Sequence, residues 1–340
     1  MFGTAIGALL GGTWTWRRLR RYDLRGKIAL VTGGGRGLGL LIARELARQG
    51  AVVVICGRDG TTLAKAVEQL AEEGLAVEAL PCDVGDAAQV ETLVEAIHQR
   101  HGRIDVLVNN AGRIEVGPVE DMTRDDFARA MQTHFWGALD TMLAVIPEMR
   151  ARGEGRIVNV SSIGGIVAVP HLVPYSASKF ALRGLSEGMR AELAQDGVVV
   201  TTVCPGLMRT GSPRNARFKG QHREEYAWFR LGDALPVSSM SGRRAARQIV
   251  AACRDGRGHV VLSIPAKLAA LLEGNFPGLV GAAMQVVHRL LPAAGGDERA
   301  SFSGAESASA VSESWLTALD RRAAVENNEM LEEPARPSYP

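Results

Sequence analysis

The sequence has few cysteines and little net charge, and each shortage excludes a class of protein. Its four cysteines, Cys56, Cys82, Cys204 and Cys253, stand alone beside apolar runs and show no metal-ligand spacing. We therefore predict buried, reduced thiols and no metal site. A formal net charge of +2 gives no reason to expect nucleic acid or an acidic substrate. With 340 residues, the chain is long enough for one large α/β domain and additional segments.

The apolar run at the N-terminus is too short for an ordinary membrane-spanning helix. Residues 2–16 carry no charge, but glycines interrupt them and they fall short of the roughly 20 residues that such a helix needs. Arginines follow in residues 17–21, whereas a secretory signal carries its basic residues first. We expect residues 1–23 to form a weak anchor, with 2–21 touching the cytoplasmic face of a membrane. A disordered leader, or a helix packed on the domain or on a second subunit, is the alternative.

Strand-like and helix-like patterns alternate over most of the chain. Strands are predicted at Ile28–Thr32, Val52–Cys56, Val77–Pro81, Val106–Asn109, Arg156–Val160, Val198–Val203 and His259–Leu262. Helices are predicted near 38–49, 61–73, 87–101, 124–150, 175–195 and 242–254. This alternation predicts a Rossmann-like α/β fold: a doubly wound parallel sheet of about seven strands with helices on both faces. A ligand crevice is expected at the carboxyl ends of the strands.

We expect one catalytic domain over 24–292, in a cytoplasmic protein that forms a homo-oligomer. Residues 293–340 are predicted to be a tail. Its first part, 293–314, is rich in Ala, Ser and Gly and indicates a flexible linker, whereas 312–330 could form one further helix.

A glycine-rich turn follows the first predicted strand. Its sequence from residue 32 is Thr-Gly-Gly-Gly-Arg-Gly-Leu-Gly, and a helical pattern begins near Leu38. Glycines let the backbone approach a pyrophosphate, and a helix N-terminus offers unpaired N–H groups and a partial positive charge. Strand, turn and helix in this order therefore indicate a dinucleotide site.

A tyrosine and a lysine four residues apart, Tyr175 and Lys179, share one face of a predicted helix, and Ser162 precedes the tyrosine by thirteen residues. A free phenol titrates near 10, too high for a good base at neutral pH. A nearby ammonium group favours the phenolate. Such a pair is commonly only a pair of surface neighbours, so its interpretation depends on the other patterns.

Together these patterns resemble the short-chain dehydrogenase/reductase (SDR) family, whose turn has the spacing Thr-Gly-x-x-x-Gly-x-Gly. The resemblance covers roughly residues 24–262. Other matching segments follow in the family's order: Asp83-Val84, Asn109-Asn110-Ala111-Gly112, Ser162, Tyr175 with Lys179, and Pro205-Gly206 with Thr210. The resemblance implies an oxidoreductase that transfers a hydride between a nicotinamide cofactor and a small carbonyl or alcohol substrate.

The resemblance also implies roles for single residues. Tyr175 is the acid/base, Lys179 lowers its pKa and binds the nicotinamide ribose, and Ser162 orients the substrate oxygen. Asp83 contacts the adenine edge, and for Asn109 a structural role is expected. The expected cofactor-binding residues are Gly33, Gly35, Arg36, Gly37, Leu38, Gly39, Arg58, Asp83, Val84, Asn110, Ala111, Gly112, Tyr175, Lys179, Pro205, Gly206 and Thr210.

One position departs from the family pattern. His134 occupies the place of the family's asparagine, which holds a water linking the catalytic lysine to solvent. Imidazole can also hold a water, as donor or acceptor. His134 is therefore a fourth candidate catalytic residue, as a relay. The alternative is a catalytically lapsed cofactor-binding scaffold at a membrane or in a complex.

The residues after the second predicted strand indicate the cofactor. An acidic side chain there would bind the ribose hydroxyls of NAD and repel a 2′-phosphate, but Gly57 occupies the place and Arg58 follows it. Arg36 lies in the glycine-rich turn, and two guanidinium groups can pair a phosphate. Asp59 is expected to cap the next helix. NADP(H) is therefore the preferred cofactor, although NAD(H) stays open.

The segment Gly211–Ser241 is expected to set substrate selectivity. It is rich in aromatic and basic side chains, among them Phe218, Tyr226 and Lys219. An apolar lid with a basic rim suits a hydrophobic substrate. Ordinary packing, or contact with a membrane or another subunit, is the alternative.

Overall fold

The computed structural model describes residues 21–235, 238–295, 300–309, 312 and 317–330. The predicted anchor, apart from its last residues, and the end of the tail lie outside the described residues.

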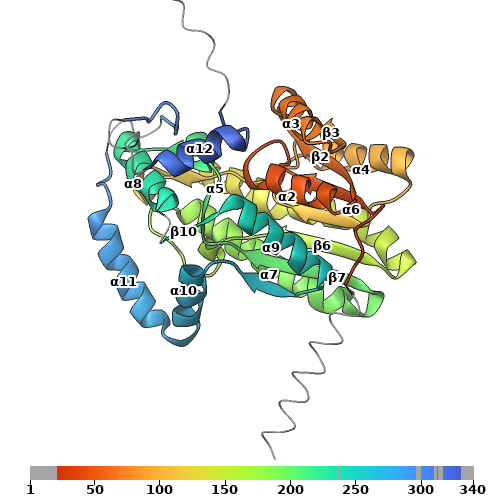
Figure 1. Cartoon of the computed structure of the whole chain (residues 1–340). Coiled ribbons are helices and arrows are strands. Elements are labelled where there is room, and N and C mark those ends of the chain that lie inside the picture. Colours follow the sequence, from red (N-terminus) through yellow and green to blue (C-terminus); the bar gives the residue numbers. More distant parts are fainter. Residues whose placement is uncertain (1–20, 236–237, 296–299, 310–311, 313–316, 331–340) are drawn as a thin grey trace, which may run out of the picture.

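A seven-stranded parallel sheet forms the centre of the molecule, with the strand order β11-β7-β6-β4-β1-β2-β3 (Figure 1). This confirms the predicted Rossmann-like fold. The strands are β1 (Ile28–Thr32), β2 (Val52–Gly57), β3 (Val77–Pro81), β4 (Val106–Asn109), β6 (Gly155–Val160), β7 (Val198–Cys204) and β11 (His259–Val261). All ladders within this sheet are parallel.

Helices cover both faces of the sheet because its strands are apolar on both sides. In β1, Ala29 and Val31 belong to one buried cluster, and Ile28 and Leu30 to the other. The first cluster includes side chains of α2 (Gly37–Arg48), α3 (Gly60–Glu72) and α9 (Gly242–Arg254). The second includes side chains of α4 (Ala87–His101), α6 (Gly137–Arg152) and α7 (Val173–Leu193). All four cysteines are buried and free, as predicted.

The long helix predicted over 124–150 is interrupted. It consists of α5 (Arg124–Met131), a π-helical turn η2 (Gln132–Trp136) and α6. π-helical turns inside helices are rare and frequently lie at functional sites. Here the turn contains His134, whose side chain is directed into the interior of the protein.

Small additional sheets lie beside the main one. Antiparallel and parallel pairings join β12 (Phe302–Ser303), β9 (Arg217–Phe218) and β5 (Glu115–Val116). β8 (Leu207–Arg209) pairs with β10 (Ser239–Ser241), and α8 (His222–Ala234) precedes β10. Residues 302–309 thus differ from the flexible linker that composition suggests. Phe302 stacks on His222, and this contact holds the segment against α8.

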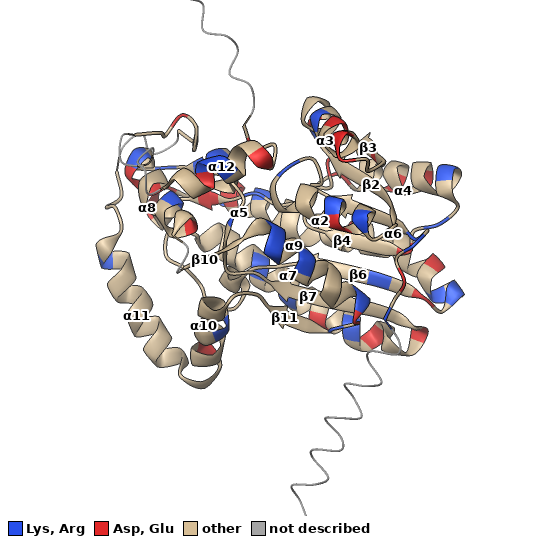
Figure 2. Cartoon of the chain, viewed as in Figure 1, with Lys and Arg blue, Asp and Glu red and all other residues tan. Residues whose placement is uncertain are grey.

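Two consecutive helices, α10 (Ile264–Asn275) and α11 (Pro277–Leu290), stand at one side of the molecule and carry few charged residues (Figures 1 and 2). Several of their large apolar side chains are exposed, among them Ile264, Leu279 and Leu290. Among the residues that the structure describes, no helix combines the length and the apolar character needed to cross a bilayer.

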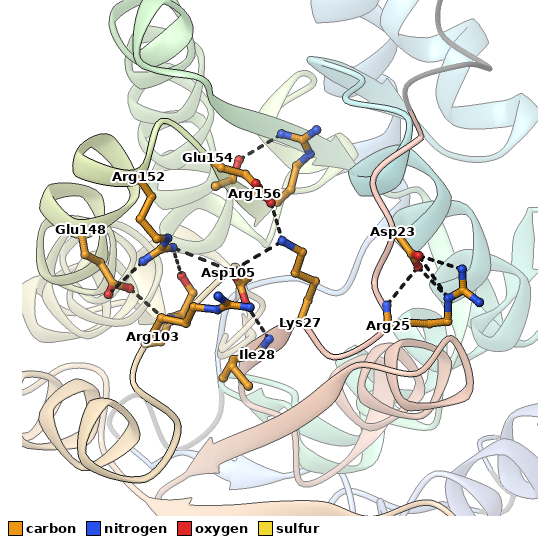
Figure 3. A network of polar contacts seen from close by, with 12 residues as sticks. Asp23, Arg25, Lys27, Ile28, Arg103, Asp105, Glu148, Arg152, Glu154 and Arg156 are labelled. Carbon is orange, nitrogen blue, oxygen red and sulfur yellow. Dashed lines mark hydrogen bonds and ion pairs between the residues drawn. The ribbon is translucent and has the colours of Figure 1, made fainter.

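A buried carboxylate joins three strands at the amino ends of the sheet, far from the predicted crevice. The Asp105 carboxylate, 3% exposed, accepts hydrogen bonds from the amide of Ile28 (2.9 Å) and from Nε of Arg103 (3.0 Å). Its own amide donates to the Ile28 carbonyl, and its carbonyl accepts from the Arg156 amide. Lys27 Nζ lies 4.0 Å away (Figure 3). Asp105 therefore fixes the starts of β1, β4 and β6 relative to one another.

We predict that Asp105→Ala lowers the free energy of unfolding by about 1–3 kcal/mol, because it leaves the buried Ile28 amide without its acceptor and removes the partner of the partly exposed Lys27 and Arg103. Urea unfolding followed by circular dichroism measures this. Asp23→Ala is the control: Asp23 pairs with Arg25 at the surface (Figure 3), so it should change stability little. Equal effects of the two substitutions would contradict the role given to Asp105.

Candidate active site

The glycine-rich turn is fastened to the loop after β4. Thr32 Oγ1 accepts hydrogen bonds from the amides of Asn110 and Ala111, both 3.0 Å long. The Asn110 side chain in turn donates to the carbonyls of Thr32 (3.1 Å) and Gly33 (3.3 Å). A Cβ at Gly39 would collide with the Gly33 carbonyl, so only glycine allows α2 to begin so close to the turn.

A cavity of about 340 Å³ lies at the carboxyl ends of the strands. All four candidate catalytic residues line it. The candidate cofactor residues also line it, with the exception of Gly37, whose amide donates to the Asn327 carbonyl (2.8 Å). The structure thus brings together residues that are up to 177 positions apart, from Gly33 to Thr210.

One end of the cavity is formed by the glycine-rich turn and by guanidinium groups, which complement the negative charge of a dinucleotide's phosphates. Leu38 and Gly39, in the first turn of α2, line this end of the cavity, and the amides of a first helical turn have no acceptor within the helix. Arg36 and Arg58 line the same end, beside Gly57. Asp59 accepts hydrogen bonds from the amides of Thr61 and Thr62, so it caps α3 as predicted. The residues present therefore fit a nicotinamide dinucleotide.

Tyr175 and Ser162 form a pair at the other end of the cavity. Ser162 follows β6 and its hydroxyl accepts from the Gly164 amide (3.0 Å). Shielding from water raises the pKa of Tyr175 to about 12, and a hydrogen bond with Ser162 opposes this rise. Burial lowers the pKa of Lys179 to about 7, and its Nζ donates to the Val160 carbonyl (2.9 Å).

Lys179 lies beside Tyr175 but hydrogen-bonds to the backbone. Its Nζ is 5.7 Å from the centre of the phenol ring and donates to the Val160 carbonyl. Burial lowers the pKa of Lys179 to about 7, so its side chain carries part of a positive charge near neutral pH. That this charge favours the phenolate of Tyr175 stays a prediction, and a hydrogen bond with Ser162 favours the phenolate as well.

His134 is a buried, neutral imidazole with both nitrogens engaged. Its Nε2 accepts the amide hydrogen of Arg113 (3.1 Å), so Nδ1 carries the proton and donates to Ser178 Oγ (2.7 Å). Ser178 Oγ then donates to the Tyr175 carbonyl (2.8 Å). Burial, reinforced by the charges of Lys179 and Arg113, holds the pKa of His134 well below its usual 6.5.

This arrangement gives His134 a different place from the predicted relay. The described contacts of its imidazole lead to Tyr175 and to the loop after β4, whereas Lys179 bonds elsewhere. The His134 ring also packs edge-to-face on the Tyr175 ring, with centroids 5.5 Å apart. The side chain therefore holds the segment that carries the phenol.

The other residues singled out by the sequence have structural contacts. Asn109 donates to Asn159 (2.9 Å) and accepts from Thr141 (2.7 Å), which confirms its structural role. Asp83 accepts from the Gly85 amide (3.0 Å) at the cavity edge. Thr210 is buried, and its hydroxyl donates to Ser212.

The aromatic residues of Gly211–Ser241 do not form the exposed lid that composition suggests. Phe218, Tyr226 and Phe229 are buried in one small apolar cluster. Lys219, expected at a basic rim, is buried in an ion pair with Asp126 (2.6 Å). These aromatic side chains are buried because the segment packs on Val116 and Leu172, which come from other parts of the chain.

Residues of the C-terminal segment were missed by the sequence analysis. Glu329 lines the cavity, and Asn327 and Asn328 contact its glycine-rich rim. Polar residues in a tail carry no periodic signal. Ser178 and Arg113 were also missed, because their contribution depends on contacts that only the fold creates.

Comparisons with known proteins indicate the same class of enzyme as the geometry of the site does. A family model described as "short chain dehydrogenase" matches residues 27–219, more than half of the chain. Dehydrogenase/reductase SDR family member 4 of Mus musculus is 39% identical over 215 residues, 60% of this chain and 77% of that protein.

Similar solved structures support the same family. A short-chain dehydrogenase from Streptomyces avermitilis has a TM-score of 0.67 and 30% identity, and the match covers 78% of this chain and 98% of that chain. A gluconate 5-dehydrogenase from Burkholderia cenocepacia, solved with NADP and tartrate, has a TM-score of 0.63 and 31% identity. That match covers 74% of this chain and 99% of the other.

The chain belongs to the short-chain dehydrogenase/reductase family. It is an NAD(P)-dependent oxidoreductase that acts on the CH–OH/C=O pair.

We predict that His134→Leu lowers kcat about ten- to a hundredfold, because a buried hydrogen-bonded partner worth about 1–3 kcal/mol is lost beside Tyr175. His134→Asn, which can still donate and accept, should restore most of kcat. The imidazole should add no limb near pH 6.5 to the wild-type profile, since its pKa lies far lower. Steady-state kinetics from pH 5.5 to 9 test this, and a histidine limb absent from His134→Asn would contradict it.

Proposed function

We propose that this protein is an NADP(H)-dependent oxidoreductase for a hydrophobic carbonyl or alcohol substrate, with Tyr175 as the acid/base. One observation carries the proposal: Ser162, Tyr175 and Lys179 line the same cavity as the glycine-rich turn and two arginines. That combination supports a site in which proton-transfer groups and phosphate-binding groups share one cavity. It also favours an active enzyme over a lapsed scaffold.

When bound in this cavity, the nicotinamide would supply or take the hydride. Tyr175 then gives a proton to the substrate oxygen, or takes one from it in the oxidation direction. Ser162 would hold the substrate oxygen by a hydrogen bond, and it lies beside Tyr175 next to Gly164.

Lys179 acts beside the phenol as a proton carrier and as a contact to the cofactor ribose. Burial puts its pKa at about 7, so it can gain or lose a proton near neutral pH without a large cost. Its Nζ is held by the Val160 carbonyl at the end of β6.

An apolar wall favours a hydrophobic substrate. Ile114, Met208 and Ala216 line the cavity, and Ile114 packs on the aromatic cluster that also contacts Tyr175. Ligand cavities commonly combine such apolar walls with a few polar groups that orient the ligand, here Ser162 and Tyr175.

Two arginines, together with the lack of an acidic side chain at Gly57, favour NADP(H). Gly57 has no side chain to meet the ribose hydroxyls, and Asp59 is committed to capping α3. Arg58 is exposed at the mouth of the cavity and is available to pair a 2′-phosphate with Arg36. The Burkholderia relative was solved with NADP.

We predict that Arg58→Ala weakens NADPH binding about ten- to a hundredfold and NADH binding little, because a charge-assisted bond to phosphate is worth about 1.5–3 kcal/mol. Titration by nucleotide fluorescence measures both dissociation constants. Arg48→Ala, which removes another exposed arginine paired with Glu73, is the control. Equal losses for the two nucleotides, or a wild-type preference for NADH, would refute the assignment.

We also predict that Tyr175→Phe abolishes turnover in a screen of hydrophobic carbonyl compounds with NADPH, followed by absorbance. The ring stays and only the hydroxyl is lost, so NADPH should bind as in wild type. Turnover within about tenfold of wild type would mean that another group carries the proton.

A further inference from the structure

The C-terminal segment closes one wall of the cofactor cavity. We call residues 317–330, which include helix α12 (Ala318–Glu326), the C-terminal clasp. Figure 1 shows α12 beside α8, on the side of the molecule where the carboxyl ends of the strands lie. Asp320 accepts from the Gly211 amide (3.2 Å), and Ala324 packs so close to Gly211 that a Cβ there would clash.

The clasp bridges two parts of the protein that face each other across the cavity. On one side, the Asn327 carbonyl accepts from the Gly37 amide (2.8 Å), and Asn328 Nδ2 donates to the carbonyls of Gly35 (2.9 Å) and Thr62 (3.0 Å). On the other side, Asn327 Nδ2 donates to the Thr210 carbonyl (3.1 Å). The clasp thus contacts both the glycine-rich turn and the segment after β7.

Glu329 at the end of the clasp places a carboxylate among phosphate-binding groups. It is 4% exposed and lines the cavity. Its Oε2 lies 3.6 Å from Nε of Arg36 and accepts from Asn215 Nδ2 (2.6 Å). Its Oε1 lies so close to Gly37, at the start of α2, that a Cβ at Gly37 would clash with it. A negative group therefore occupies the partially positive helix N-terminus, where a dinucleotide's phosphates would be stabilised.

We propose that Glu329 competes with a phosphate of the nicotinamide dinucleotide for Arg36 and the start of α2, and so sets the affinity of the enzyme for its cofactor. This inference rests on the proposal that the cavity holds such a cofactor. The phosphate is either the 2′-phosphate, which only NADP(H) carries, or the pyrophosphate, which both nucleotides carry. Cofactor binding then requires Glu329 to be neutral or to leave its contact with Arg36.

The competition should depend on pH. Burial raises the pKa of Glu329 to about 7, whereas Arg36 and the Asn215 hydrogen bond oppose the rise. Above pH 7 the carboxylate is charged and repels the phosphate, and below pH 7 it is neutral and the repulsion is lost. NADPH should therefore bind more weakly as the pH rises through 7.

Other charged or titratable groups around Glu329 also influence cofactor binding near pH 7. Wild type and variant are therefore compared with each other at each pH. The Arg36 guanidinium faces Glu329 and opposes the rise of its pKa, whereas the Asp320 carboxylate of α12 contributes to the rise. Across the cavity Lys179 has a pKa of about 7, while His134 stays neutral. Lys179 and the 2′-phosphate are present with wild type and with a Glu329 variant alike, so the difference between the two proteins at each pH reports the removal of the Glu329 charge and its effect on its neighbours.

The test is the dissociation constant of NADPH and of NADH, measured by fluorescence and calorimetry from pH 6 to 8.5 in wild type and Glu329→Gln. At pH 8.5 the variant should bind NADPH about tenfold more tightly than wild type, and at pH 6 the two should agree within about twofold. A gain for NADPH alone assigns the competition to the 2′-phosphate. A gain for both nucleotides assigns it to the pyrophosphate.

Glu326→Gln is the matched control. Glu326 lies on α12, pairs with Arg243 and Arg322, and does not line the cavity. Its variant should follow wild type at every pH. Thermal unfolding monitors the fold: because the folded-state pKa of Glu329 is raised, its charge destabilises the fold above pH 7, and Glu329→Gln should melt no lower than wild type at pH 8. Glu329→Ala, which also removes the charge, is a second variant with the same expected gain.

The inference is overturned if the Glu329 variants bind both nucleotides as wild type does at pH 8.5, or more weakly. Failure of the cofactor assignment gives a different result. If wild type prefers NADH while Glu329→Gln still gains affinity for NADH, the NADP(H) proposal fails and the role of Glu329 stands.

Discussion

The close joint between the glycine-rich turn and the loop after β4 is the constraint on which the site depends. Thr32 and Asn110 exchange hydrogen bonds across it, and Gly39 allows α2 to start against the Gly33 carbonyl. The same loop after β4 runs on to Arg113, whose amide donates to His134. The joint therefore links the phosphate end of the cavity to the imidazole that supports Tyr175, so the two ends keep a fixed separation.

Shielding from water decides the charges in the cavity. It lowers the pKa values of Lys179 and His134 and raises those of Tyr175 and Glu329. All four shifts favour the neutral form, so the cavity without its cofactor holds less charge than its residues suggest. Such a site should bind a charged ligand strongly. The phosphate and nicotinamide groups would interact with side chains that are already shielded from water, where electrostatic interactions are stronger.

Much of the architecture could be predicted from the sequence because its signals are local. Apolar strands, amphipathic helices and the Asp59 cap each depend on a few neighbouring residues, and the parallel sheet follows from their alternation. The cavity residues from Gly33 to Thr210 could be found because they follow strands in a known order. The π-helical turn and the hydrogen bonds of His134 could not, because they depend on Ser178 and Arg113, which only the folded chain brings close.

The contacts of the clasp could not be predicted either, because they join residues that are even farther apart in the sequence. Asn327 meets Thr210, which is 117 residues earlier, and Asn328 meets Gly35, which is 293 residues earlier. Each contact orders the chain at an entropic cost that only several simultaneous bonds can offset. The backbone and amide bonds of Asn327 and Asn328 hold the segment, and this allows a buried carboxylate to be kept at a position that disfavours its charge. The hydrogen bonds of the clasp thus stabilise the segment, whereas the buried charge of Glu329 destabilises it. A cofactor phosphate changes only the electrostatic cost of Glu329.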